Sequence, residues 1–244
     1  MESPEILVKE LILIGGGHAH VHTIKMLGMK AERGVAVTLI SRDVDSPYSG
    51  MIPGFVAGHY TREECHVDLA KLCSFAGVNM VHAEACKLDT NKRLIYCKDG
   101  RPPIHYDVLS IDVGIAPKPL PQIFKENRFN ITPVKPIDGF ASRWDVILAR
   151  VLAVAEESSM RIALVGGGAG GVELGFAMHH RLHKEMEALG KDSSNLQITI
   201  YNRGKNLMSS HSRSVNHPSR IEIASCMQNL LWNITQLRFS SLKF

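Results

Sequence analysis

The apolar positions of the chain follow the same succession of patterns twice, once near the amino end and once after residue 160. Each copy has an apolar run, a glycine turn, apolar residues at helical spacing and a second apolar run. The first copy comprises a strand at 5–14, a turn at 15–17, a helix at 19–27 and a strand at 35–40. The second comprises a strand at 161–165, a turn at 166–168, a helix at 171–189 and a strand at 196–201. Two such βαβ units predict an α/β fold with two three-layer, Rossmann-like domains.

The residues between the two copies have shorter patterns. Residues 43–60 contain two prolines and three glycines and are predicted to form a long loop. They are followed by a short amphipathic helix at 67–76, strands at 79–85, 93–97 and 106–112, and a helix at 143–155. The prolines at 117, 119 and 121 remove backbone donors and mark a boundary. We therefore expect domains at 1–118 and 119–244, the second with an atypical tail from about residue 209.

Composition narrows the class of protein. Hydrophobic residues make up 45% and charged residues 21% of the 244 residues, which is ordinary for a globular protein. The net charge is +4, and lysine and arginine are spread along the chain, so nucleic acid is not an expected partner. The acidic amino end lacks the features of a presequence, and the stretch 162–178 is rich in glycine. We therefore expect no transmembrane segment and a cytoplasmic location.

The two glycine turns point to the chemistry. In G-x-G-x-x-G the first glycine permits a tight turn, the second lets a pyrophosphate approach the backbone, and the third lets helix and strand pack closely. The amino end of the helix attracts the anion through its unpaired amides and its dipole. The second turn has all three glycines, Gly166, Gly168 and Gly171. The first has Gly15 and Gly17, with a histidine in the third position, so the chain is predicted to bind two dinucleotides.

The acidic residue that usually holds the ribose hydroxyls is missing from both units. It is expected at the end of the second strand, where the first unit has Ser41 and Arg42 and the second has Asn202 and Arg203. Asp43 is a candidate substitute in the first unit. An arginine at this place also suits a 2′-phosphate, so both NADH and NADPH remain open.

Two further motifs give the chain a family resemblance. The segment Y-D-V-L-S-I-D-V-G-I-A-P at 106–117, together with the second glycine turn and V-E-L at 172–174, resembles the pyridine nucleotide-disulfide oxidoreductase superfamily over about residues 6–205. Within it, G-G-G-H-A-H at 15–20 and S-P-Y-S-G-M-I-P-G at 46–54 are similar to the flavoprotein domain fused to selenide, water dikinase. That branch is similar to type II NADH dehydrogenases.

The resemblance implies that the first domain binds FAD and the second binds NAD(P)H. The FAD pyrophosphate would lie against Gly15 and Gly17, with His18 close to its phosphates at the start of the helix. The residues implied beside the flavin are Pro47, Tyr48, Asp112, Gly114 and Pro117. Glu173 would lie on the helix that points toward the nicotinamide and the flavin. Its alternative role is that of a first-turn carboxylate that stabilises the amino end of this helix.

An activity follows from the same resemblance. NAD(P)H would pass hydride to FAD, and the reduced flavin would pass electrons to a quinone or another small acceptor. The alternative is a truncated, non-catalytic nucleotide-binding fragment or regulatory module, because residues 209–244 do not continue the family pattern. The resemblance also implies that the first domain is incomplete. The chain alone is therefore expected to bind FAD weakly and to associate with selenide, water dikinase or with a second copy. An amphipathic helix is predicted at 221–237.

The cysteines do not suggest a disulfide mechanism. The chain has five, widely spaced, and Cys65 and Cys73 are eight residues apart across a predicted helix. A helix would separate them by about 12 Å, which is beyond the reach of a disulfide. A dithiol mechanism is therefore not expected.

The histidines do not suggest a metal site. His18 with His22 and His179 with His183 have the i,i+4 spacing that places two side chains on one helix face. Neither pair has the glutamate of H-E-x-x-H, so no metal site is predicted. His179 and His183 are instead expected on a solvated face.

Overall fold

The computed structural model describes residues 9–115, 131–153, 160–203, 207–208 and 211. The chain divides into two compact units. The first comprises Met1–Ser49 and Arg62–Phe140, and the second comprises Gly50–Thr61 and Ala141–Phe244. The expected boundary between residues 118 and 119 lies outside the described residues and stays a prediction.

The first unit is built on a four-stranded parallel sheet with the order β5-β2-β1-β9. Its strands are β1 (Lys9–Ile14), β2 (Val35–Ser41), β5 (Asn79–His82) and β9 (Val108–Ile111). The register pairs Ile14 of β1 with Ile40 of β2 and with Ile111 of β9. The three strands therefore end together, and the loops that follow them meet at one edge of the sheet.

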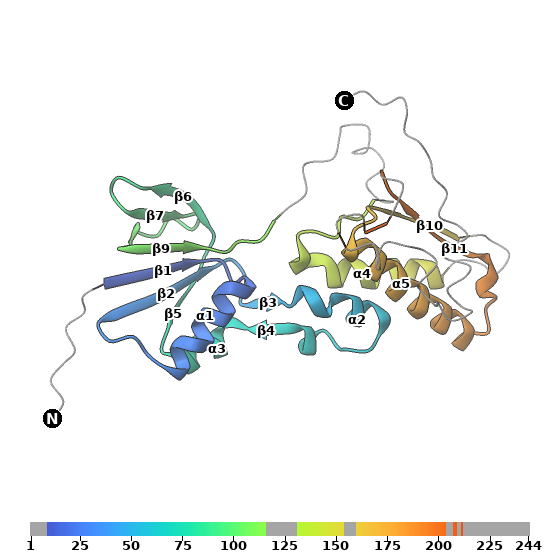
Figure 1. The fold of residues 1–244 in the computed structure, drawn as a ribbon, viewed down its shortest axis with the longest axis horizontal. Coiled ribbons are helices and arrows are strands. Elements are labelled where there is room, and N and C mark those ends of the chain that lie inside the picture. The colour runs from blue at the N-terminus through green and yellow to red at the C-terminus, as the bar shows by residue number, and fades with distance from the viewer. Residues whose placement is uncertain (1–8, 116–130, 154–159, 204–206, 209–210, 212–244) are drawn as a thin grey trace, which may run out of the picture. The chain divides into compact units, whose positions relative to one another are not determined.

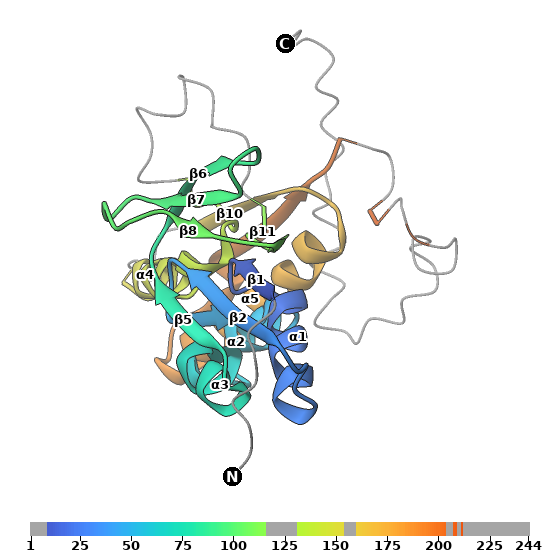
Figure 2. The same cartoon turned by 90° about the vertical axis from the view of Figure 1, so that its left-hand side faces the viewer.

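Two different layers cover this sheet (Figures 1 and 2). Helices α1 (His18–Met29) and α3 (Leu69–Ala76) pack on one face, where Leu13, Ile24 and Leu39 are fully buried. Burying each such side chain contributes about 1.5–3 kcal/mol. The antiparallel strands β6 (Ala85–Asp89), β7 (Leu94–Cys97) and β8 (Ile104–His105) cover the other face through Ile95 and neighbouring residues. The unit thus has the three layers that the βαβ pattern predicts.

The prediction of one long loop at 43–60 is wrong, because this segment contains ordered elements. β3 (Asp45–Pro47) pairs in antiparallel fashion with β4 (His66–Asp68), and the short 3-10 helices η1 (Ser49–Met51) and η2 (Glu63–Cys65) flank helix α2 (Ile52–Ala57). Pro53 lies in the first turn of α2, and Gly58 is its left-handed C-cap. Proline and glycine therefore delimit a helix here, which is their usual asymmetry at helix ends.

The second unit contains the other βαβ arrangement. Strands β10 (Met160–Val165) and β11 (Leu196–Tyr201) are parallel, and helix α5 (Ala169–Ala188) connects them, followed by η6 (Ser193–Asn195). A β-carbon on Gly175 would lie 3.1 Å from Leu164 Cδ1 and 3.2 Å from Ile200 Cδ1, so α5 packs closely on both strands. Helix α2 contacts α5 within this unit. Together the two units confirm the α/β, Rossmann-like prediction.

Smaller differences from the predicted elements have local causes. The strand expected at 79–85 is two strands, because β5 joins the parallel sheet and β6 starts the antiparallel one. The helix expected at 143–155 is α4 (Phe140–Leu152), preceded by η5 (Ile137–Gly139). The helix predicted at 221–237 lies outside the described residues. In the described part of the chain, no helix is long and apolar enough to cross a membrane.

Candidate functional site

The first glycine turn joins β1 to α1 at the edge where three parallel strands end. Gly15 has a φ of +93°, a conformation that favours glycine. Its N–H donates to the Ile40 carbonyl at 2.8 Å, and the Gly17 N–H donates to the Asp112 carbonyl at 3.2 Å. The turn is therefore held by the strands on both sides of β1.

Asp112 closes the amino end of α1. This residue directly follows β9, and its Oδ2 accepts hydrogen bonds from the N–H of Ala19 at 2.9 Å and of His20 at 3.4 Å. The N-cap residue Gly17 makes no side-chain cap, and a β-carbon at this position would overlap the Asp112 carboxylate. The space that Gly17 leaves, assigned to a pyrophosphate by the glycine motif, is thus occupied by a carboxylate of the chain itself.

His20, in the position of the third glycine, connects the turn to β9. Its side chain is buried, with 3% exposure. Nδ1 lies 2.6 Å from the Gly15 carbonyl and Nε2 lies 2.8 Å from Ser110 Oγ. Because a carbonyl can only accept, Nδ1 donates to it, while Nε2 pairs with the Ser110 hydroxyl. Sequence reasoning missed this role, since it treated His20 only as a departure from the motif.

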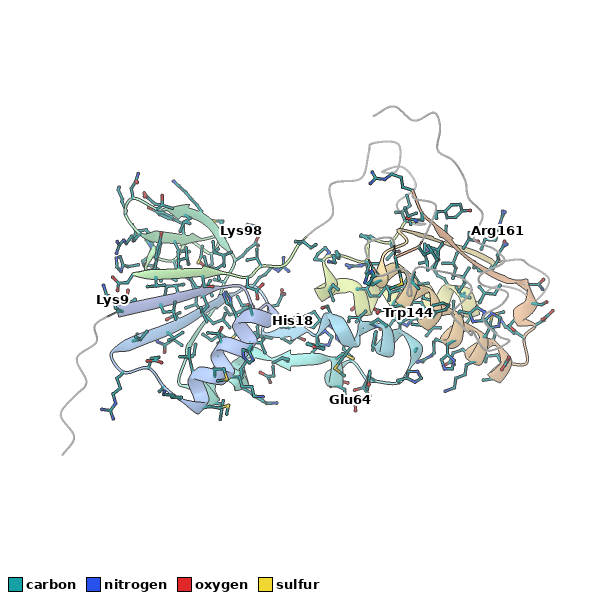
Figure 3. All side chains as sticks on the ribbon, viewed as in Figure 1. Lys9, His18, Glu64, Lys98, Trp144 and Arg161 are labelled. Atoms are coloured by element: carbon teal, nitrogen blue, oxygen red, sulfur yellow. The ribbon has the colours of Figure 1, made fainter. Side chains whose placement is uncertain are left out.

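His18 and Tyr48 come together from separate segments. His18 is the first residue of α1 and is labelled in Figure 3. Its ring meets the Tyr48 ring edge-on, with centroids 4.7 Å apart, and its Nε2 accepts from the Ser49 N–H at 3.4 Å. The Tyr48 N–H donates to the Cys65 carbonyl at 2.7 Å, next to the pairing of Pro47 with His66. Two residues expected near FAD therefore share one site at the start of α1.

The other residues expected around FAD are placed as follows. Ser41 ends β2 and is buried; its hydroxyl donates to the Asp43 carbonyl at 2.8 Å. Arg42 Nε lies 3.0 Å from Asp43 Oδ2, so the candidate substitute for the ribose-binding acid is engaged in an exposed ion pair. Gly114 has a φ of +69° and open space where a β-carbon would lie. Pro117 lies outside the described residues.

The second glycine turn joins β10 to α5 and has a different geometry. Gly166 has a φ of +122°, and its N–H donates to the Tyr201 carbonyl at 2.9 Å. A β-carbon on Gly171 would collide with the Gly166 carbonyl oxygen, whereas one on Gly168 or Gly170 would meet nothing within 4 Å. Gly168 is the N-cap of α5 without a side-chain cap, and the first turn has no acidic residue. The turn is therefore closely packed at Gly171 and leaves open space at Gly168 and Gly170.

Asn202 lies beside this second turn. A β-carbon on Gly167 would be 2.6 Å from Asn202 Cγ and 2.7 Å from Leu207 Cδ2. The Gly167 carbonyl accepts from the Met208 N–H at 2.7 Å. Arg203 follows Asn202 and is exposed. The two residues expected at the end of the second strand thus lie directly after β11, at the edge of the sheet where the turn lies.

Glu173 is exposed on α5. The helix begins at Ala169, and its first turn contains no acidic residue. The interpretation of Glu173 as a first-turn carboxylate that stabilises the helix amino end is therefore wrong. Its proposed place near the nicotinamide stays a prediction.

The cysteines are free thiols in the described part of the chain. Cys65, Cys73 and Cys97 are buried, and burial raises the pKa of each thiol; Cys86 is exposed. Cys65 ends η2 and Cys73 lies in α3, with β4 between them. The argument that one helix separates these two cysteines was therefore wrong.

The paired histidines of α5 are half-buried, so the expectation of a solvated face is wrong. The rings of His179 and His183 lie 4.1 Å apart. Burial, followed by the nearby His183 and His180, lowers the pKa of His179 to about 4, and burial also lowers the pKa of His183. Among the described residues, no three His, Cys, Asp or Glu side chains gather as a metal-binding group.

Comparison with known proteins gives a family and a fold. The sequence matches the model of the pyridine nucleotide-disulphide oxidoreductase family over residues 9–220. No curated protein matches it.

Several solved structures resemble the chain. NDH2 of Plasmodium falciparum in complex with NADH has a TM-score of 0.70 and 20% identity, over 94% of this chain and 48% of that one. The sulfide:quinone oxidoreductase of Aquifex aeolicus has a TM-score of 0.63 and 20% identity, over 82% and 44%. The water-forming NADH oxidase of Lactobacillus brevis has a TM-score of 0.54 and 17% identity, over 82% and 41%. The chain thus spans about half the length of these proteins, and the likeness shows the shared fold.

Proposed function

Because the chain belongs to the pyridine nucleotide-disulphide oxidoreductase family, we propose that it is an FAD-dependent NAD(P)H oxidoreductase that passes electrons to a quinone or another small acceptor. Family membership confirms FAD and NAD(P)H as the cofactors of this class of protein. In this proposal FAD binds at residues 1–118 and the nicotinamide cofactor at residues 119–244. Hydride transfer is chemistry that the flavin and the nicotinamide supply when bound, while the protein contributes position and electrostatics.

The single observation that carries the proposal is the geometry of the second glycine turn. Gly171 packs against the Gly166 carbonyl, while Gly168 and Gly170 leave open space in front of the amino end of α5. Backbone amides and the helix dipole favour an anion there, and no side chain caps the N-cap residue. These features support a pyrophosphate at this turn.

The residues around the second turn have separate tasks in this proposal. Asn202 and Arg203 follow β11 and would hold the ribose or its 2′-phosphate, which leaves both NADH and NADPH open. Glu173, two residues after Gly171 and exposed, would face the nicotinamide from α5. Gly166 and Gly171 would keep α5 close enough to β10 to present its amides.

The proposed flavin site is less ready to accept its cofactor than the proposed nicotinamide site. His18 and Tyr48 lie together at the start of α1, and Gly114 leaves open space beyond β9. These positions, with Pro47 and Pro117, are proposed to border the flavin. The amides at the amino end of α1, however, are occupied by the Asp112 carboxylate, so a pyrophosphate fits there only if this side chain moves.

That carboxylate favours a second candidate function, a nucleotide-binding module that does not retain flavin and does not turn over.

For the oxidoreductase, the electron acceptor is proposed to be a quinone because one of the similar structures is a sulfide:quinone oxidoreductase. Association with selenide, water dikinase or with a second copy stays a prediction, as does a cytoplasmic location.

The test is NADH oxidation by the purified chain with added FAD and a soluble quinone, followed by absorbance. Flavin-dependent oxidation supports the oxidoreductase, and NADH binding without oxidation supports the binding module.

The variant Gly168→Trp should weaken NADH binding strongly without unfolding the protein, because a side chain there enters the open space of the turn. Ala188→Trp, which carries the same indole at the exposed far end of α5, is the matched control and should bind NADH normally. Equal NADH affinity of both variants would contradict the proposal.

A further inference from the structure

We propose that Asp112 is an internal anion that competes with the pyrophosphate of FAD for the amino end of α1. Flavin then binds only after the carboxylate has rotated away from the helix. This inference rests on the proposed function, because it concerns how the first unit takes up FAD. It assigns to Asp112 a regulatory role in cofactor binding.

The Asp112 carboxylate uses the backbone amides that a pyrophosphate would need. A phosphate group at a glycine turn is held by the unpaired N–H groups of the first helical turn. In α1 two of these, those of Ala19 and His20, already donate to Asp112 Oδ2 at 2.9 Å and 3.4 Å. A pyrophosphate and this carboxylate therefore require the same donors.

The Asp112 carboxylate fills the space that the glycines of the first turn leave. A β-carbon on Gly17 would overlap all three atoms of the carboxylate group. A β-carbon on Gly15 would overlap the Asp112 carbonyl oxygen. The backbone of Asp112 is fixed on both sides, because its N–H donates to Ile14 at 2.8 Å and its carbonyl accepts from Gly17 at 3.2 Å. Only the side chain is therefore free to rotate, which allows the anion to leave while the strand stays in place.

The charge of the Asp112 carboxylate also opposes a second anion at this helix end. Among the described residues no lysine or arginine pairs with Asp112, so its charge is balanced by the α1 amides alone. The first turn of α1 carries no acidic residue of its own. The amino end of α1 therefore stabilises the Asp112 carboxylate. A phosphate group at the same helix end would be repelled by that carboxylate, because like charges repel at short range.

The contrast with the second unit supports this interpretation. The corresponding helix α5 starts with an uncapped Gly168, and a β-carbon there would meet nothing within 4 Å. Among the described residues, no carboxylate closes this second turn as Asp112 closes the first. We therefore expect NAD(P)H to bind without displacing any side chain and FAD to bind against internal competition.

The experiment measures FAD affinity by quenching of flavin fluorescence in the full chain and in the variants Asp112→Asn and Asp112→Ala. Loss of the charge should tighten FAD binding about tenfold, the order expected when one charge-assisted hydrogen bond no longer competes. Asp107→Asn is the matched control. Asp107 also accepts a backbone N–H, that of Glu10 at 2.8 Å, but at the opposite end of β1, so FAD affinity should not change.

A second readout is independent of flavin chemistry. The backbone amide resonances of Ala19 and His20 should shift in FAD-free Asp112→Ala relative to the wild type, and FAD should shift them in the wild type. Thermal melting of each variant checks that it is folded.

The outcomes separate the two proposals. Equal or weaker FAD binding by both Asp112 variants, with normal binding by the wild type, overturns the inference and leaves the proposed function intact. If neither the wild type nor the folded Asp112→Ala binds FAD, the inference and the proposed FAD site both fail. Tighter binding by both Asp112 variants but not by Asp107→Asn supports the competition.

Discussion

The α-carbon of Gly171 lies against the carbonyl oxygen of Gly166, with no space for a β-carbon between them. Helix α5 can approach β10 this closely only because position 171 is glycine. Gly170, its neighbour in the same helical turn, has open space at the same place. The two adjacent glycines therefore have separable roles, one in packing and one at the open side of the turn.

We predict that Gly171→Ala destabilises the protein by about 1–3 kcal/mol, because the added methyl group must displace backbone atoms. Gly170→Ala is the control. It adds the same methyl group into open space within a helix, where alanine is preferred to glycine by about 1 kcal/mol, so stability should be unchanged or higher. Urea denaturation followed by circular dichroism measures both. Equal stability of the two variants would contradict the assigned packing.

Both βαβ units can be predicted from the sequence, because apolar runs and glycine turns are local patterns. Helix α2 cannot be recognised in the same way. Pro53 and Gly58 indicate a loop when they are counted as breakers, yet one lies in the first turn of the helix and the other caps its end. Only the contact of α2 with α5 decides between these readings, and a contact between distant segments leaves no periodic pattern.

The residues of the candidate sites also differ in whether the sequence alone identifies them. The glycines of the second turn are identified by their spacing. The closure of the first turn depends on Asp112 and Ala19, which are 93 positions apart in the sequence. A usable signal did exist, because acidic and hydroxyl residues at the end of a parallel strand next to β1 must lie near the turn. The same reasoning identifies Ser110 as a partner for His20.

The thiols give a second prediction. Burial raises the pKa of Cys65, Cys73 and Cys97 and so lowers their thiolate fraction, while Cys86 is exposed. Among these four, Cys86 should react first with iodoacetamide at pH 8 in the folded protein, and the order should disappear in urea. Peptide mass spectrometry measures the labelling. Preferential labelling of folded Cys65 or Cys73 would restore a thiol mechanism.

The third prediction concerns pH and His179. Its pKa is about 4 in the folded protein and near 6.5 when unfolded, so the unfolded chain binds the extra proton first as the pH falls. This contribution to stability is complete above pH 6.5 and is lost as the pH falls toward 4. Solvent screening of the half-buried ring limits the loss to about 1 kcal/mol.

The variant His179→Gln should therefore lose less stability than the wild type between pH 6.5 and pH 4, and the difference between the two curves removes the contribution of the carboxylates. His22→Gln is the control, because His22 is an exposed histidine on a different helix, α1. Urea unfolding at four or five pH values measures the curves. A parallel course for wild type and His179→Gln would show that His179 is solvated after all.

The last prediction concerns β9, which is the end strand of its sheet among the described strands and pairs there with β1. Val108 and Ile111 on this strand are 54% and 57% exposed, and Val113 and Ile115 just beyond it are 68% and 69% exposed. An apolar strand with unpaired backbone groups favours edge-to-edge association. We therefore expect Val108→Lys to raise the protein concentration at which light scattering begins, because a charged edge residue opposes pairing. Val146→Lys is the control, since Val146 is 58% exposed on helix α4, where the backbone is already hydrogen-bonded. The same gain in both variants would mean that added charge, and not the sheet edge, controls association.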